Sequence, residues 1–153
     1  MHTYLENYVL GEELKETVSN PYAQQSLDMA KIVIKEGLKN VDEYWGTEVA
    51  LYHPELYAGT TDLVGVHSGA DAILDFKQSN KVKKREYVED YFLQLCAYAE
   101  AKKKIQGNKI PKGVLLKCTK DFQYQEFIIE GEEFDKWRDK WWSRVEEYYI
   151  KHR

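Results

Sequence analysis

Cysteines, prolines and long apolar runs are all scarce in this chain of 153 residues. Its two cysteines, Cys96 and Cys118, are too few for a zinc cluster or a four-cysteine iron–sulfur site, so we expect no iron–sulfur cluster. Both lie in apolar stretches, which predicts buried thiols rather than a disulfide and suits a reducing cytosol. No apolar run approaches the roughly 20 residues that a membrane-spanning helix needs, so we expect no membrane partner.

The N-terminus lacks a basic segment followed by an apolar one, which predicts no signal peptide and a cytoplasmic protein. A basic excess is also missing, because the formal net charge is −4 at pH 7. Proteins that hold nucleic acid by charge alone usually carry such an excess, so a simple DNA-binding protein is disfavoured. An enzyme is not subject to this limit, because its carboxylates can bind a metal ion that contacts the phosphate. Basic residues do cluster at 81–85 and 102–112, but such runs are more often solvated faces.

The hydrophobic spacing predicts a single domain over residues 1–153 with elements in the order ααβββαββα. Asn20 and Pro21 are typical of a helix start, and the apolar face of the helix that follows extends to Val41. The period changes to two from Thr47, which predicts an antiparallel meander of three strands. Further elements are expected over residues 2–10, 57–66, 72–77, 86–104, 113–118, 122–129 and 132–153. The order predicts an α/β fold of the α+β kind, with a mixed sheet flanked by helices.

Three polar residues on adjacent predicted strands carry the clearest chemical meaning: Asp62, Asp75 and Lys77. Residues two apart on a strand point to the same side, so Asp75 and Lys77 share a face. If the strands form a hairpin through the turn near Gly69, Asp62 lies beside Asp75. Two such carboxylates can hold Mg²⁺ or Mn²⁺, which prefer oxygen ligands, and the carbonyl of Phe76 can reach the same ion. Lys77 would then orient the attacking water.

The same pattern has a structural interpretation, in which Asp75 and Lys77 form only an ion pair. A carboxylate on a mainly apolar strand is costly unless it is paired or bound to a metal. Both arrangements meet that requirement, so the pattern alone leaves the two interpretations equally open.

A further motif on the next helix gives the set its resemblance to a known family. The motifs occur along the chain in a fixed order: Gly59 and Asp62 first, then Asp75 to Lys77, then Gln94 and Tyr98. This ordered set resembles the motifs of the RecB-type branch of the PD-(D/E)XK nucleases. Within it the chain is most similar to the mitochondrial genome maintenance exonuclease family and its phage or bacterial relatives. The resemblance implies a restriction-endonuclease-like core and a metal-dependent DNA exonuclease that degrades single strands. Without a visible transit peptide, we expect a bacterial cell or a phage-infected host as its setting.

The resemblance also implies roles for individual residues. Gln94 would support the substrate or Lys77, and Tyr98 would form part of the site wall. His2 has a Glu four residues later, as on the branch's upstream helix, so it would complete the metal shell. The alternative for His2, a frayed terminal residue, stays open.

Other residues have weaker patterns. The basic cluster Lys81, Lys83, Lys84 and Arg85 follows the catalytic strand and could contact substrate phosphates, and Tyr87 could stack on an unpaired base. Tyr91 could stack on a base in the same way, although packing in the core is favoured for it, and the histidines at 53 and 67 are expected in solvated turns. The expected stripe of core residues on the last helix is Phe134, Trp137, Trp141, Val145 and Tyr148.

Three other functions remain open from the sequence. One is a structure-specific endonuclease acting on duplex or branched DNA. Another is a nucleic-acid-binding module whose catalytic core has decayed, although Asp62, Asp75 and Lys77 are all present. The last is an interaction protein whose motif match is chance. A role in DNA replication, repair or recombination follows only from the resemblance.

Overall fold

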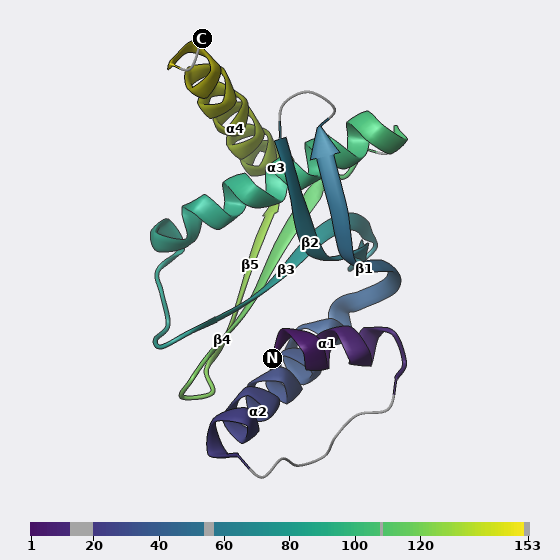
Figure 1. The fold of residues 1–153 in the computed structure, drawn as a ribbon, viewed down its shortest axis with the longest axis vertical. Helices are drawn as coiled ribbons and strands as arrows, with labels where there is room; N and C mark the ends of the chain where they lie inside the picture. Colours follow the sequence, from purple (N-terminus) through teal and green to yellow (C-terminus); the bar gives the residue numbers. More distant parts are fainter. Residues whose placement is uncertain (13–19, 54–56, 108, 152–153) are drawn as a thin grey trace.

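The computed structural model describes residues 1–12, 20–53, 57–107 and 109–151, and Figure 1 shows their arrangement. The helices and strands follow one another in the predicted order. They are α1 (His2–Val9), α2 (Pro21–Glu36), β1 (Val41–His53), β2 (Tyr57–His67), β3 (Ala70–Ser79), α3 (Glu89–Gln106), β4 (Lys112–Thr119), β5 (Tyr124–Glu130) and α4 (Gly131–Lys151). Short 3₁₀ helices at Leu38–Asn40 and Arg85–Val88 precede β1 and α3.

The strands form one five-stranded sheet in the order β1-β2-β3-β4-β5. Neighbouring strands are antiparallel except β3 and β4, which are parallel and are joined through α3. A parallel pair requires such a crossover, because a tight hairpin can join only antiparallel strands. The predicted meander and the mixed sheet flanked by helices are both confirmed.

The start of α2 follows the predicted signals, but its end does not. The side chain of Asn20 accepts hydrogen bonds from the backbone N–H groups of Tyr22 at 2.8 Å and Ala23 at 3.4 Å, which caps the helix. The helix ends before Gly37, where a Cβ would overlap the Tyr124 hydroxyl. Val41, predicted to lie on the helix face, instead begins β1, which starts before the predicted Thr47.

Helices cover both faces of the sheet, and each face has its own core (Figure 1). Alternate residues of β3 and β4 point to opposite faces, so Ile73 and Leu115 pack under α3 and α4, and Leu74 and Leu116 pack against α1 and α2. Every residue of β4 is buried, as expected for a strand covered on both sides. These rigid strands carry the polar residues described below.

The aromatic stripe of α4 packs as predicted only in its first half. Phe134 and Trp137 are each 3% exposed and Trp141 is partly buried, whereas Tyr148 is 55% exposed. The prediction for Tyr148 is wrong because α4 continues past the edge of the sheet (Figure 1). Both cysteines are free and buried, as predicted. None of the helices in the described ranges has the length and apolar character that crossing a membrane requires.

Candidate active site

The candidate site lies where β2 and β3 separate. Their backbone ladder runs from the turn at Ser68 and Gly69 to its last pair, Leu63 with Leu74. Beyond that pair a side chain takes over, because the Thr61 hydroxyl donates to the Leu74 carbonyl at 3.2 Å. The strands therefore stay joined while their backbones diverge, which opens space between them for polar side chains.

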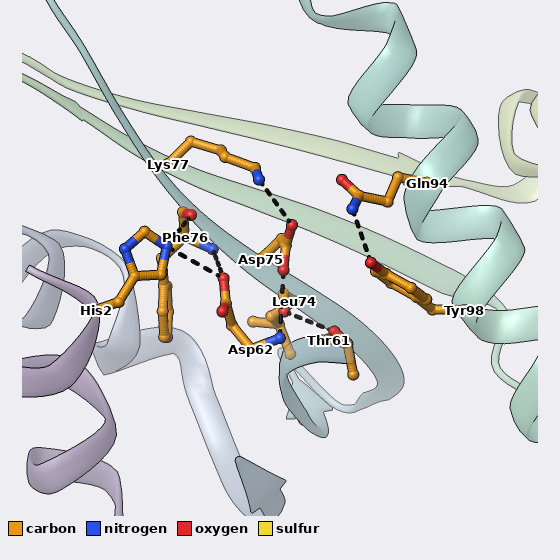
Figure 2. Close-up of polar contacts among 9 residues, drawn as sticks. All are labelled: His2, Thr61, Asp62, Leu74, Asp75, Phe76, Lys77, Gln94 and Tyr98. Carbon is orange, nitrogen blue, oxygen red and sulfur yellow. Dashed lines mark hydrogen bonds and ion pairs between the residues drawn. The ribbon is translucent and has the colours of Figure 1, made fainter. Parts of the chain in front are cut away.

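Two carboxylates bridge the diverging strands (Figure 2). Asp62 Oδ2 accepts a hydrogen bond from the backbone N–H of Phe76 at 2.8 Å. In return, Asp75 Oδ1 lies 3.3 Å from the backbone nitrogen of Asp62, which donates to it. Each carboxylate thus satisfies a backbone donor on the opposite strand, and the predicted neighbourhood of Asp62 and Asp75 is present.

Lys77 lies beside this pair. Its Nζ is 3.5 Å from Asp75 Oδ2 and 4.9 Å from the centre of the Tyr91 ring. This is the ion pair of the structural interpretation, and it also holds the amine at the carboxylate that a metal would use. Tyr91, expected in the core, is 36% exposed because it lines the hollow beside Lys77, which lies over its ring, and does not join the apolar core. That expectation is wrong.

The two carboxylates titrate in opposite directions. Asp75 is 4% exposed, and burial together with the neighbouring Asp62 charge raises its pKa to about 7. Burial alone would also raise the pKa of Asp62, but hydrogen bonds to His2, Asp75 and the Phe76 N–H outweigh it, so the pKa is lowered. At neutral pH Asp62 is therefore ionised, whereas Asp75 is only partly ionised.

The N-terminal residue of α1, His2, reaches the same place from the other side of the sheet. Its Nε2 donates to the carbonyl of Phe76 at 2.6 Å and lies 3.5 Å from Asp62 Oδ2. The hydrogen bond to Asp62 raises the pKa of the imidazole. The structure thus brings His2, Asp62 and the Phe76 carbonyl together, and Nε2 acts here as a proton donor.

The donor set suits a hard divalent cation in kind. Two carboxylates and a backbone carbonyl supply oxygen ligands, and the raised pKa of Asp75 indicates negative charge that a cation would offset. Within the described ranges, no three His, Cys, Asp or Glu side chains converge as a preformed metal site. Asp62 and Asp75 would therefore rely on the Phe76 carbonyl as the third oxygen.

Gln94 and Tyr98 face the carboxylates from α3. They are four residues apart on one side of the helix, and Gln94 Nε2 donates to the Tyr98 hydroxyl at 2.7 Å. Figure 2 shows both side chains pointing toward Asp75. Tyr98 is 8% exposed, and burial raises the pKa of its hydroxyl. It can therefore donate a hydrogen bond at neutral pH.

The predicted basic cluster divides in the structure. Arg85 forms an ion pair with Glu133 and donates to the carbonyl of Ile128 at 2.9 Å, so it ties its own segment to the start of α4. Lys84 is exposed, and Lys81 and Lys83 line a hollow that also includes Lys77.

Some residues were placed wrongly or overlooked. His67, predicted in a solvated turn, is 1% exposed at the end of β2, and its Nε2 lies 3.5 Å from Glu126 Oε1. Glu48, on the first predicted strand, is by sequence either an exposed residue or a further ligand of the metal site; its side chain and that of His53 lie outside the described residues. Sequence reasoning did not single out Lys117, which is 1% exposed. A lysine inside the apolar stretch from Val114 to Cys118 was the available signal.

Neither a family model nor a curated protein matches this chain. Among solved structures it is similar to an exonuclease candidate from Eubacterium rectale, with a TM-score of 0.67 and 16% identity, covering 97% of this chain and 63% of that one. The chain therefore spans less than two thirds of that structure. Weaker likenesses are to SSO0001 (TM-score 0.44, 19% identity, 87% and 62% coverage) and to the alkaline exonuclease LHK-Exo from Laribacter hongkongensis (0.33, 13%, 99% and 81%). The first of these comparisons shows a shared fold.

Proposed function

We propose that this protein is a metal-dependent nuclease that hydrolyses DNA phosphodiester bonds, as an exonuclease acting on single strands. The observation that carries the proposal is the pair of carboxylates Asp62 and Asp75 across the diverging strands, with Lys77 Nζ 3.5 Å from Asp75. An exonuclease candidate of the same fold supports the reaction class. The preference for single strands and for ends rests on the motif resemblance.

We assign each residue a role that its position supports. Asp62, Asp75 and the Phe76 carbonyl would hold Mg²⁺ or Mn²⁺, with His2 as a further ligand once its ring turns from the carbonyl. Such an ion supplies polarisation of the phosphodiester and a lowered pKa of bound water. Lys77 orients the attacking water and offsets the charge that develops on the phosphate.

The remaining residues close the site from the helix side. Gln94 orients the substrate or Lys77, and its hydrogen bond to Tyr98 fixes both side chains against α3. Because the hydroxyl of Tyr98 stays protonated, it can donate to a phosphate oxygen at neutral pH. The buried surroundings of Asp75 limit the access of bulk water, which strengthens the electrostatic contacts.

The test is cleavage of end-labelled single-stranded DNA with Mg²⁺, with Mn²⁺ and with EDTA. We expect the strand to be degraded only with metal and not by Lys77→Ala or Asp75→Asn. Lys35→Ala, on the exposed side of α2, removes a positive charge on the opposite side of the sheet and should leave cleavage unchanged. Full activity in both site variants would refute the assignment.

The choice of substrate separates the alternatives. A strict exonuclease leaves a closed single-stranded circle intact, whereas an endonuclease cuts it. A linear duplex run beside the single strand tests strand preference. Binding of DNA without metal, and no cleavage with any metal, would indicate the decayed binding module instead.

A further inference from the structure

A polar row crosses three strands beside the candidate site. By strand register, Lys77 of β3 pairs with Lys117 of β4, and Lys117 pairs with Gln125 of β5. All three lie on the face that α3 covers. The preceding row on that face consists of Asp75 and the apolar Leu115 and Phe127. The row at Lys77 is therefore the first step away from the carboxylates, and it carries two amines.

Lys117 is buried without a carboxylate partner among the described residues. Its side chain is 1% exposed, and Nζ donates to the Lys81 carbonyl and to Gln125 Oε1, each at 3.0 Å. Burial and the nearby Lys83 charge lower the pKa of the amine. A buried charge that only neutral oxygens contact is costly. An anionic ligand would offset that cost and could accept the third N–H of the ammonium.

The same residues fix the shape of the segment that follows β3. Gln125 Oε1 accepts from the Lys83 backbone N–H at 2.9 Å, and Gln125 Nε2 donates to the Lys83 carbonyl at 2.9 Å. The Ser79 hydroxyl donates to the Lys81 carbonyl at 2.7 Å. Because these hydrogen bonds hold the backbone at Lys81 and at Lys83, the two lysine side chains start from defined positions.

A hollow of about 610 Å³ lies over this row. Five lysines line it, together with the ring of Tyr91: Lys77, Lys81, Lys83, Lys117 and Lys120. None of the described residues that line it is acidic. Lys77 is paired with Asp75 beside the hollow, but this one carboxylate does not balance five amines, which would repel one another, whereas phosphate groups would neutralise them.

We propose that this hollow binds the backbone phosphates of the nucleic-acid strand next to the bond that is cut, with Lys117 and Lys120 as contacts from β4 and the turn after it. The inference rests on the proposed function for where the nucleic-acid strand lies, because Lys77 belongs both to the hollow and to the candidate site. Contacts of this kind hold the strand in register and carry no base preference.

The variants that test it are Lys120→Gln and Lys117→Gln, with Lys35→Gln on α2 as the matched loss of charge. Binding of a fluorescein-labelled single strand is measured in EDTA, where no cleavage occurs, over a range of salt concentrations. We expect each site variant to bind about 5- to 10-fold more weakly at low salt. The slope of log binding constant against log salt concentration should become less steep by about 0.7 for each phosphate that the variant no longer binds. Lys35→Gln should match the wild type.

A second strand identifies the phosphate as the ligand. With neutral methylphosphonate linkages, the wild type and Lys120→Gln should bind equally, because the side chain that the variant removes has no charged phosphate to bind on this strand. If Lys117→Gln fails to fold, as circular dichroism would reveal, the exposed Lys120 decides the question. Wild-type affinity and salt dependence in Lys120→Gln would overturn the inference.

The outcome also separates this inference from the nuclease proposal. Metal-dependent cleavage with unchanged binding in the variants would retain the nuclease and remove the phosphate subsite. Weakened binding in the variants, without cleavage by the wild type under any metal, would retain the subsite and remove the nuclease.

Discussion

Replacing Asp75 with Asn should stabilise the metal-free protein at neutral and alkaline pH. Asp75 is 4% exposed, and burial with the Asp62 charge raises its pKa from 3.8 to about 7. The fold therefore holds this carboxylate at a cost whenever it is ionised. An Asn has nearly the same shape, and its Oδ1 can still accept the hydrogen bond from the Asp62 backbone N–H. The change removes the charge and keeps the bridge between the strands.

The size of the effect follows from linkage. A pKa of about 7 in the folded state against 3.8 corresponds to roughly 4 kcal/mol at pH values above both. Ionised Asp75 also stabilises the fold in part, because its hydrogen bond is among the contacts that lower the pKa of Asp62. This contribution offsets part of the cost. We therefore expect Asp75→Asn to raise the free energy of unfolding by about 2 kcal/mol at pH 8.

The sign of the pH dependence is fixed by the direction of the shift. Between pH 3.8 and about 7 the folded state binds more protons at Asp75 than the unfolded state, so the stability of the wild type falls as pH rises through this window. His2, whose pKa is raised, contributes a loss in the same direction as pH passes its folded value. The difference between the variant and the wild type removes the contributions that the two proteins share and leaves those of Asp75 and of its interaction with Asp62.

Urea unfolding in EDTA at pH 5 and pH 8 provides the measurement. The advantage of Asp75→Asn should be roughly 1 kcal/mol smaller at pH 5 than at pH 8, because pH 5 already lies within the window between 3.8 and about 7. Added Mg²⁺ or Mn²⁺ should stabilise the wild type more than the variant, because an ion that binds only the folded state shifts its stability. Equal differences at both pH values, or a less stable variant at pH 8, would refute the reasoning.

Three further predictions concern the scaffold. Phe92→Ala, which empties a fully buried position between the rings of Phe127 and Trp137, should cost about 3–5 kcal/mol in urea unfolding. Gly65→Ala should cost about 1–3 kcal/mol in the same assay, since the new Cβ would overlap a backbone carbonyl of β1; a neutral result would mean that β1 shifts freely. Neither Cys96 nor Cys118 should react with a thiol reagent until urea unfolds the chain, because both are fully buried and burial raises the pKa of Cys96 to about 12.

Local patterns predicted the elements well where pattern and packing agree. The cap at Asn20 and the alternation in β3 both persist in the structure. They did not predict the start of β1, because its first residues include Tyr44 and Trp45, which are 37% and 42% exposed. This edge strand has irregular pairing near Tyr44, so neither the helical period nor the strand period describes it.

The site shows the same division between local and long-range information. A period of two places Asp75 and Lys77 on one face, and a hairpin places Asp62 nearby. The neighbour of Lys77 across the sheet depends on the parallel pairing of β3 with β4, which are separated by all of α3. No local pattern gives that register, so Lys117 could not be assigned to the site from the sequence.

The carboxylates of the candidate site also support the fold, and this decides how they should be tested. Asp62 accepts the backbone N–H of Phe76 at the point where the ladder between β2 and β3 has ended. Asp62→Ala would leave this partly buried donor without its acceptor, which costs about 1–3 kcal/mol, and could widen the gap between the strands. Loss of cleavage in that variant would therefore have two explanations. Asp62→Asn keeps an oxygen acceptor and removes the charge, so a loss of cleavage in a protein that unfolds at wild-type urea concentrations would be assigned to chemistry.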